Sequence, residues 1–345
     1  MGTSLPGPSR YIPATTLCAV LARFGVESPI AIEPHEASKR NDNFVVVGPD
    51  AKYLLRRYRR NNDEARVRFQ LRFQAHLFAS HFPTSKIIPS VTGDPLVYED
   101  SGLWSPFTYV EGREYDFSST AEVANAAQRL AEFHRIAASF EEQEVVFDAN
   151  REWCDWWREG EREIGELASM FADRGVEEDL TFLRDWWTKS TRQWPAERVD
   201  ALPRGWIHGD WHGRNMVFVG DEVHGVFDYD PMRRGVTIED VARAVFMFGR
   251  ESRPSRRIRL DVARLFLDKY RCGRDLTSEE LNAVPFVMVA HWAPTVGYWR
   301  MLEQDGEDAV AYLRYTVGLM RDLLPEARRL QGMLAGSNPA RLNES

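Results

Sequence analysis

The sequence predicts an α+β fold in two lobes, a small strand-rich lobe followed by a larger, mainly helical lobe. Three observations lead to this prediction. Short apolar strand patterns dominate residues 1–107, helical periodicity dominates residues 113–335, and a polar strand–loop–strand segment at residues 206–230 interrupts the helical part. We expect a hinge at residues 108–112 and a tail at residues 336–345.

The elements of the small lobe follow from turn signals and from the spacing of apolar residues. Gly48-Pro-Asp50 is a strong turn signal between two apolar runs. Val67, Leu71 and Ala75 recur at helical spacing. The expected elements are, in order, a helix at residues 14–24, strands at 43–47 and 52–58, a helix at 63–80, and strands at 95–98 and 105–110.

The large lobe has clear helix-start signals. An amphipathic pattern predicts a helix over residues 119–138. Thr277-Ser-Glu-Glu280 has the spacing of a capping box and predicts the start of another helix. Within the polar interruption, short apolar strands are expected at residues 216–219 and 223–227, around the turn Gly220-Asp221.

Composition excludes several classes of protein. The chain has 345 residues, 44 basic and 52 acidic, with a net charge of −8, which argues against a general nucleic-acid binder. It has no run of about 18 apolar residues and no signal-peptide pattern at its start. Its three cysteines are far apart and odd in number, which fits reduced thiols in the cytosol better than a disulfide framework. We therefore expect a cytoplasmic monomer or homodimer that binds neither nucleic acid nor a membrane.

The candidate chemistry lies in the polar interruption. Asp210 is followed by Asn215 five residues later, and Asp228 comes after a predicted hairpin. Phosphoryl transfer needs a carboxylate that orients the attacking hydroxyl and oxygen ligands for Mg²⁺. An Asp, an Asn and a second Asp in this pattern supply such oxygen atoms. The spacing predicts a magnesium-dependent phosphotransferase.

The motif also resembles a known family. His208-Gly-Asp-Trp-His-Gly-Arg-Asn215, followed by Phe227-Asp-Tyr-Asp230, is similar to the aminoglycoside phosphotransferase and choline kinase family, which has a protein-kinase-like fold. The likeness spans about residues 15–330. It implies that Asp210 is the catalytic base and that Asn215 and Asp228 bind magnesium.

The same resemblance assigns supporting residues. Asp240, at the start of the next helix, would brace the catalytic loop together with His208. His134, in Leu130-Ala-Glu-Phe-His134, is interpreted as structural, because a histidine inside an amphipathic helix is usually a core residue.

In the small lobe, Arg56 stands where the family places a phosphate-binding cation. Strand alternation puts Leu54, Arg56 and Tyr58 on one face. The helix residue expected to pair with this cation is usually Glu, and here it is Gln70. A neutral amide offers a hydrogen bond without charge pairing. If Gln70 faces Arg56, replacing it with Glu leaves ATP binding unchanged or tighter.

Further nucleotide contacts are expected on both sides of that strand. Residues 36–43 contain no glycine, and Ser38 and Asn41 are the candidates there for covering phosphate. By resemblance, the backbone of Tyr109, Val110 and Glu111 would hold the purine of ATP or GTP.

Acceptor residues are harder to predict. Residues 141–185 contain 15 acids and five bases, a net charge of −10, which would attract a cationic acceptor. The alternative is that these acids form the solvated face of a helix. Aromatic rings can stack on sugars or enclose ammonium groups, or fill the core. The acceptor candidates are Asp230, Trp157, His291, Trp292 and Trp299.

Several functions remain open at this point. An antibiotic is the leading acceptor, partly because 39 of the 44 basic residues are arginine, which hints at a producer-type genome. A metabolic kinase for choline, homoserine or a sugar is the nearest alternative. The absence of glycine from residues 36–43 leaves a non-catalytic kinase-like scaffold possible. His208, Asp210 and His212 could also suggest a metallohydrolase, a reading that gives Asn215 no role.

Overall fold

The computed structural model describes residues 12–35, 41–59, 63–100, 102–143, 145, 153–293, 295–304 and 306–336. These residues form two compact units. The first contains the described residues up to Arg113 together with Met216–Val219 and Val223–Asp230. The second contains Glu114–Asn215, Gly220–Glu222 and the described residues from Pro231 onward.

The first unit is built on an antiparallel sheet. Its elements are α1 (Ala14–Arg23), β1 (Ala31–Pro34), β2 (Asn41–Val47), β3 (Lys52–Tyr58), α2 (Glu64–Ala79), β4 (Val97–Glu99), β5 (Gly102–Thr108), β7 (Met216–Val219) and most of β8 (Glu222–Val226). The five-stranded sheet has the order β1-β2-β3-β5-β4, and each neighbouring pair is antiparallel.

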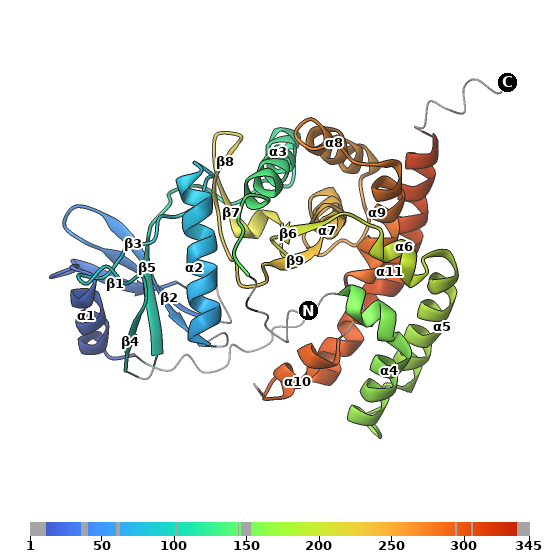
Figure 1. Ribbon diagram of the computed structural model, residues 1–345, viewed down its shortest axis with the longest axis horizontal. Coiled ribbons are helices and arrows are strands. Elements are labelled where there is room, and N and C mark those ends of the chain that lie inside the picture. Colours follow the sequence, from blue (N-terminus) through green and yellow to red (C-terminus); the bar gives the residue numbers. More distant parts are fainter. Residues whose placement is uncertain are drawn as a thin grey trace. The chain divides into compact units, whose positions relative to one another are not determined.

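Helices cover both faces of this sheet (Figure 1). On one face, Val20 and Leu21 of α1 pack against Leu55 of β3. On the other face, Leu71 of α2 packs in a cluster that Leu54 of β3 also contacts. Consecutive residues of β3 therefore face opposite cores, as the alternation of side chains along a strand requires. The predicted shared face of Leu54, Arg56 and Tyr58 is confirmed, because these three side chains line one pocket.

Local signals account for most elements of this unit. The side chain of Asp63 caps α2 by accepting a 2.8 Å hydrogen bond from the backbone N–H of Arg66. Strand β1, in contrast, was not expected. It is a short edge strand that ends at Pro34, and proline is tolerated in a sheet only at such an edge.

The first unit also extends beyond the predicted small lobe, which ends at residue 107. It continues to Arg113 and takes in the strands that follow Asn215. The physical reason is backbone pairing: Thr84 pairs with Val226, and Arg113 pairs with Phe218. Close packing adds to this pairing, because a Cβ at Gly112 would lie 2.7 Å from the Cβ of Val217.

The second unit is mainly helical. Its elements are α3 (Thr120–Ala137), α4 (Trp153–Met170), α5 (Glu177–Gln193), α6 (Ala196–Asp200), β6 (Arg204–Ile207), a 3₁₀ turn (Gly213–Asn215), β9 (Arg233–Val236), α7 (Ile238–Gly249), α8 (Leu260–Arg271), α9 (Ser278–Ala290), α10 (Val296–Gln304) and α11 (Ala309–Gly336). Strands β6 and β9 pair antiparallel. The α+β fold class predicted from the sequence is confirmed.

Side chains cap the starts of α3 and α9. The capping box predicted at α9 is confirmed, because Thr277 and Glu280 cap each other's backbone reciprocally. Ser119 caps α3, which was predicted from its amphipathic pattern alone. Across the described part of the chain, the structure contains no helix with the length and apolar character that spanning a membrane requires.

The capping box provides a stability test. Replacing Thr277 with Ala removes the hydroxyl that accepts from the N–H of Glu280, and we expect the free energy of unfolding to fall by about 1 kcal/mol. Urea unfolding measures the change. Thr277→Ser keeps the hydroxyl and is the matched control. Equal losses in the two variants would contradict the assignment.

Candidate active site

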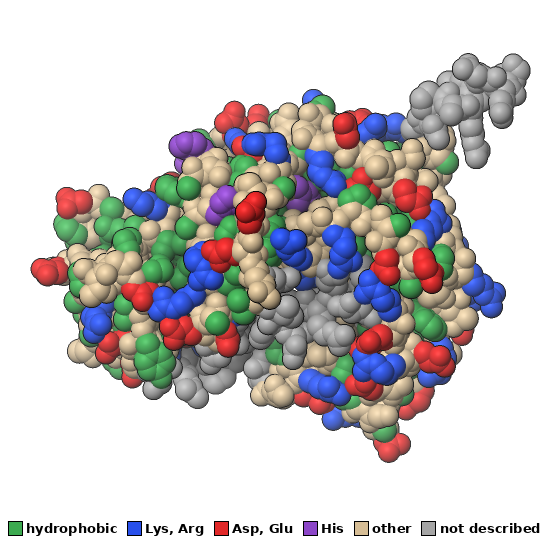
Figure 2. Space-filling model, in the orientation of Figure 1, with side chains coloured by type: hydrophobic (Ala, Val, Ile, Leu, Met, Phe, Trp, Pro, Cys, Tyr) green, Lys and Arg blue, Asp and Glu red, His purple; other side chains and the backbone are tan. Residues whose placement is uncertain are grey.

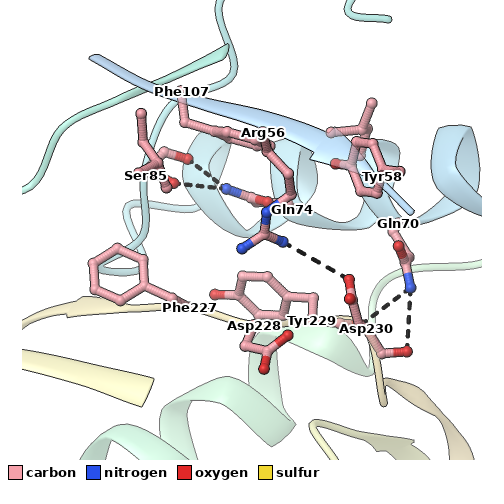
Figure 3. Close-up of a pocket in the computed structure, with 12 residues that line it drawn as sticks. Arg56, Tyr58, Gln70, Gln74, Ser85, Phe107, Phe227, Asp228, Tyr229 and Asp230 are labelled. Carbon is pink, nitrogen blue, oxygen red and sulfur yellow. Dashed lines mark hydrogen bonds and ion pairs between the residues drawn. The ribbon is translucent and has the colours of Figure 1, made fainter. Parts of the chain in front are cut away.

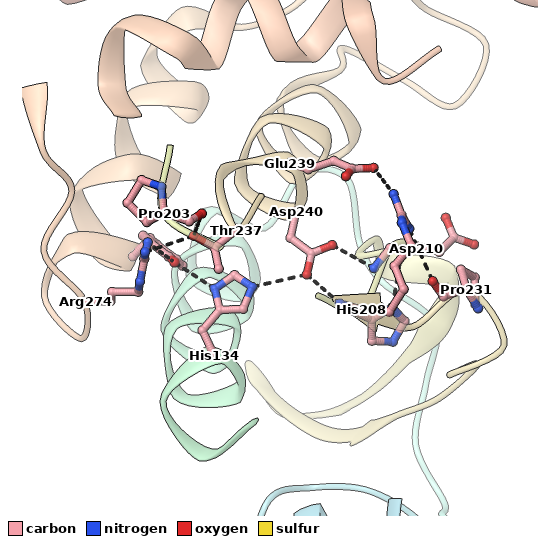
Figure 4. Close-up of polar contacts among 12 residues, drawn as sticks. His134, Pro203, His208, Asp210, Pro231, Thr237, Glu239, Asp240 and Arg274 are labelled. Carbon is pink, nitrogen blue, oxygen red and sulfur yellow. Dashed lines mark hydrogen bonds and ion pairs between the residues drawn. The ribbon is translucent and has the colours of Figure 1, made fainter. Parts of the chain in front are cut away.

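A buried carboxylate fixes the backbone of the polar loop that contains Asp210. Asp240 is fully buried in the first turn of α7, and its oxygens accept hydrogen bonds from the N–H groups of His208 and Gly209 at 2.6 and 2.8 Å. One of these oxygens also lies 3.2 Å from Nε2 of His134 (Figure 4). Burial opposes the charge on Asp240, but His134 and then His208 outweigh it and lower the pKa of this carboxyl.

The shape of this loop requires glycine at position 209. Gly209 has a φ of +78°, and a Cβ there would lie 2.7 Å from the carbonyl oxygen of Pro231. His208 before it is fully buried against Phe133 and Trp211. Its Nδ1 accepts from the N–H of Asp210 at 3.3 Å. These contacts suit a structural histidine, as predicted, and give no support to the metallohydrolase alternative.

Asp210 is partly exposed and lies beside two basic side chains. Its Oδ1 is ion-paired with Arg243 and lies 3.1 Å from Nε2 of His212. Burial would raise the pKa of this carboxyl, but Arg243 and then His212 outweigh that effect and hold the pKa well below its usual range. The carboxylate is therefore ionised at any pH near neutrality.

Asn215 closes the loop onto Asp210. Its Nδ2 donates to the backbone carbonyl of Asp210 at 3.0 Å and to Oδ2 of the same residue at 3.2 Å. Because the amide nitrogen makes both bonds, the oxygen of Asn215 is the atom suited to ligating a metal ion.

Arg243 belongs to a chain of polar contacts that the sequence analysis missed. Its guanidinium joins Asp210 to Nε2 of His291. Nδ1 of His291 lies 2.9 Å from Oε1 of Glu239, and the same oxygen accepts from Arg233 at 2.5 Å. The available signal was Arg243 itself, the one charged residue of α7 after Asp240. It comes three residues after Asp240 and so lies on the same helix face.

The first unit contains a pocket lined by Arg56 (Figure 3). Arg56 donates from Nε to Asn43 at 3.1 Å, and its Nη1 lies 3.8 Å from Asp230. Asp230 also accepts from Nδ2 of Asn41 at 2.8 Å. Burial opposes the charge on Arg56, but the Asp230 carboxylate outweighs it and raises the pKa of the guanidinium. Asp230 therefore holds Arg56, which does not support its predicted role in acceptor binding. The contact of Asn41 with phosphate stays a prediction.

Gln70 requires a further correction. Its amide nitrogen donates to the backbone carbonyls of Tyr229 and Asp230, at 3.5 and 3.2 Å. The carboxylate that faces Arg56 comes from Asp230, so Gln70 supports the segment that carries the carboxylate instead of pairing with the cation. The expectation that Glu at this position leaves ATP binding unchanged or tighter no longer holds, because a carboxylate there would face two carbonyl oxygens.

Asp228 lines the same pocket and has an unusual backbone. Its φ is +64°, in the left-handed region that non-glycine residues rarely adopt. Strain of this kind is concentrated at functional sites, where the surrounding structure maintains it. The carboxylate of Asp228 and the amide oxygen of Asn215 are hard donors of the kind that Mg²⁺ prefers.

The predicted hinge has a defined local structure. The N–H of Tyr109 donates to the carbonyl of Lys52 at 3.1 Å, and Nζ of Lys52 donates to Glu111 at 2.8 Å. Val110 contacts the strand that follows, since a Cβ at Gly225 would lie 3.1 Å from its Cγ1. Ser38, predicted to contact phosphate, lies outside the described residues.

Two aromatic acceptor candidates belong to the core. Trp157 is buried against Trp186 and Phe286, and its indole N–H donates to the carbonyl of Trp194 at 2.8 Å. Trp299 is fully buried against Phe171. The prediction that these two rings contact the acceptor is therefore wrong. Their positions on their helices direct both rings into the core. His291 and Trp292, in contrast, lie beside Arg243, whose guanidinium carbon is 5.0 Å from the centroid of the Trp292 ring.

Several acids of the acidic segment pair with arginine. Glu166 pairs with Arg162 at 2.5 Å and with Arg300 at 2.9 Å, and Asp179 pairs with Arg321 at 2.9 Å. Figure 2 shows acidic and basic side chains interspersed over the region of α4 and α5. The solvated-face interpretation of these acids therefore fits better than a cationic-acceptor site.

Comparison with known proteins identifies the family. A profile of the phosphotransferase enzyme family matches residues 31–276, more than two thirds of the chain. The chain belongs to this family. The predictions of a family resemblance and of a small-molecule kinase are thereby confirmed.

Named relatives of this phosphotransferase are similar over most of their length. A homoserine kinase of Sinorhizobium medicae (strain WSM419) is 23% identical over 271 residues, which is 79% of each chain. A homoserine kinase of Methylobacillus glycogenes is 27% identical over 253 residues, or 71% of each chain.

Solved structures share the fold at lower identity. An aminoglycoside phosphotransferase from Alicyclobacillus acidocaldarius subsp. acidocaldarius DSM 446 has a TM-score of 0.62 at 16% identity and covers 96% of this chain and 98% of its own. An amicoumacin kinase in complex with AMP-PNP, Ca²⁺ and Ami has a TM-score of 0.65 at 14% identity and covers 88% and 92%.

The environment of Gln70 leads to a pH-dependent prediction. In Gln70→Glu, a carboxylate facing carbonyl oxygens has a raised pKa in the folded state, so the variant loses stability as the pH rises through that value. We expect unfolding free energies about 1–3 kcal/mol below wild type at pH 8 and a smaller deficit at pH 5. Urea unfolding at both pH values measures this. Gln70→Met, which introduces no charge, is the control with a pH-independent deficit; a pH-independent deficit in Gln70→Glu would contradict the prediction.

Proposed function

We propose that this phosphotransferase moves the γ-phosphoryl group of ATP, with Mg²⁺, to a hydroxyl group of a small molecule. The observation that carries the proposal is the Asp210–Asn215 loop, held by Asp240 in a chain that belongs to the phosphotransferase family. GTP is the alternative phosphoryl donor. Choosing between the two nucleotides is part of the test.

In this proposal Asp210 positions the attacking hydroxyl. Phosphoryl transfer passes through a loose transition state, so the base orients the hydroxyl and accepts its proton late. The depressed pKa of Asp210 suits this role, because a weak base that stays ionised can hold a hydroxyl by hydrogen bonding. The proton moves to a carboxylate oxygen of Asp210 as the bond to phosphorus forms.

The remaining residues act on the nucleotide. Asn215 and Asp228 supply the oxygen ligands for magnesium, which when bound neutralises charge on the phosphates. Arg56, held by Asp230 and Asn43, steadies the phosphates as a fixed cation. The backbone from Tyr109 to Glu111 holds the purine.

We propose homoserine as the first acceptor to examine, because homoserine kinases are similar over 79% of this chain. The antibiotic acceptor predicted from the sequence becomes the second candidate. It was placed first because of the arginine-rich composition, and the acidic excess of residues 141–185 would favour a cationic member of the class. Two of those acids pair with arginines outside the segment, which reduces their attraction for a cationic acceptor. Choline and sugars complete the panel.

An ADP-release assay with Mg·ATP and Mg·GTP against this panel tests the proposal, with the product located by phosphorus NMR. Turnover on one acceptor supports it. If nucleotide raises the melting temperature but no compound is phosphorylated, the non-catalytic scaffold is favoured. If nucleotide also fails to stabilise the chain, the kinase function is rejected.

Substitutions separate the proposed roles. We expect Asp210→Asn to lower kcat at least a hundredfold while Mg·ATP binding survives, because the amide cannot accept the hydroxyl proton. Asp228→Asn should weaken Mg²⁺-dependent nucleotide binding as well. Calorimetric titration with Mg·AMP-PNP and steady-state kinetics distinguish the two. Wild-type turnover in Asp210→Asn would contradict the mechanism.

A further inference from the structure

The cation beside Asp210 is unusual in its setting. Arg243 projects from α7 with only 12% of its side chain exposed, and it binds the carboxylate proposed to hold the acceptor hydroxyl. A buried arginine is costly unless its N–H groups are satisfied. The hydrogen-bond partners of Arg243 therefore indicate which kind of ligand can bind beside it.

The guanidinium is fixed from behind by a directed chain of hydrogen bonds. Burial and then the nearby Arg243 lower the pKa of His291, so its ring is neutral near pH 7. With Nδ1 donating to Glu239, Nε2 of the neutral ring must accept, and it accepts from Arg243. The Trp292 ring lies against the guanidinium carbon at 5.0 Å.

This arrangement leaves donors without acceptors. Among the described residues, Nε of Arg243 and the indole Nε1 of Trp292 are buried with no hydrogen-bond partner. Both atoms can only donate. A ligand that completes this site must supply acceptor oxygens, and a carboxylate matches the planar fork of an arginine. A cationic amine would meet two donors and a positive charge.

We propose, as an extension of the proposed function, that Arg243 with Trp292 binds a carboxylate of the acceptor. Without acceptor, Arg243 occupies Oδ1 of Asp210. An acceptor carboxylate competes for the guanidinium and releases that oxygen to receive the hydroxyl. The acceptor class is then a hydroxy acid or hydroxy amino acid. An alcohol without a carboxylate leaves Asp210 paired with Arg243 and reacts poorly.

Three related probes separate the groups on the acceptor. L-Homoserine has a hydroxyl, an amine and a carboxylate, whereas 4-hydroxybutyrate lacks the amine and 3-amino-1-propanol lacks the carboxylate. We expect the wild-type enzyme to phosphorylate the first two with a kcat/KM at least tenfold above that for the third. A preference for the amino alcohol or for an aminoglycoside would overturn the proposal while leaving phosphoryl transfer intact.

The variant Arg243→Met keeps the packing of the stem and removes the guanidinium. At pH 8, where Asp210 is ionised in either protein, we expect its KM for carboxylate acceptors to rise about 10- to 100-fold. Its KM for ATP should stay within about threefold of wild type. Its kcat/KM for 3-amino-1-propanol should not fall, because Arg243 no longer occupies Oδ1 of Asp210 in this variant. Arg243→Lys, which restores the charge without the fork, should recover part of the loss.

The controls separate this inference from its premise. Arg198→Ala removes another arginine of the second unit, paired with Glu279 at 2.5 Å, and should leave all constants unchanged. Melting temperatures establish that each variant is folded. A rise in KM for ATP alone would assign Arg243 to the nucleotide phosphate and overturn the proposal, as would equal losses for all acceptors. No turnover on any compound by the wild type would instead reject the proposed function.

Discussion

The buried carboxylate of Asp240 is the interaction on which the geometry of the loop containing Asp210 depends. The backbone N–H groups of a sharp loop packed inside a protein need hydrogen-bond acceptors. The two carboxylate oxygens of Asp240 accept from the N–H groups of His208 and Gly209. The carboxylate lies in the first turn of α7, where the helix dipole favours a negative charge. The direction of the Asp210 side chain follows from this anchor and from the positive φ of Gly209.

The same helix then determines the electrostatics of Asp210. Arg243 lies three residues after Asp240, so one rigid element both anchors the loop and presents a cation to its carboxylate. The backbone of the loop and the backbone that carries the cation are therefore held by the same helix. Glu239 and His291 fix the far side of the guanidinium, which leaves the side facing Asp210 as the part able to exchange partners.

Local signals made the fold predictable, and long-range pairing limited the prediction of the site. The caps at Asp63, Ser119 and Thr277 act over three residues, so the sequence alone locates those helix starts. Strand β9 has a polar sequence and is a strand because β6 pairs with it. The partner of Arg56 was sought one helix away at Gln70 but lies 174 positions along the chain, at Asp230.

Charge explains why the acceptor was the hardest feature to predict. A segment with a net charge of −10 suggests an acidic surface when its residues are counted along the chain. The field around it depends on partners far away in the sequence, such as Arg300 and Arg321. Conversely, Arg243 is the single cation of α7 and barely changes any local charge count. Because its side chain is only 12% exposed, its charge is screened less by salt than the charges of the exposed acids are.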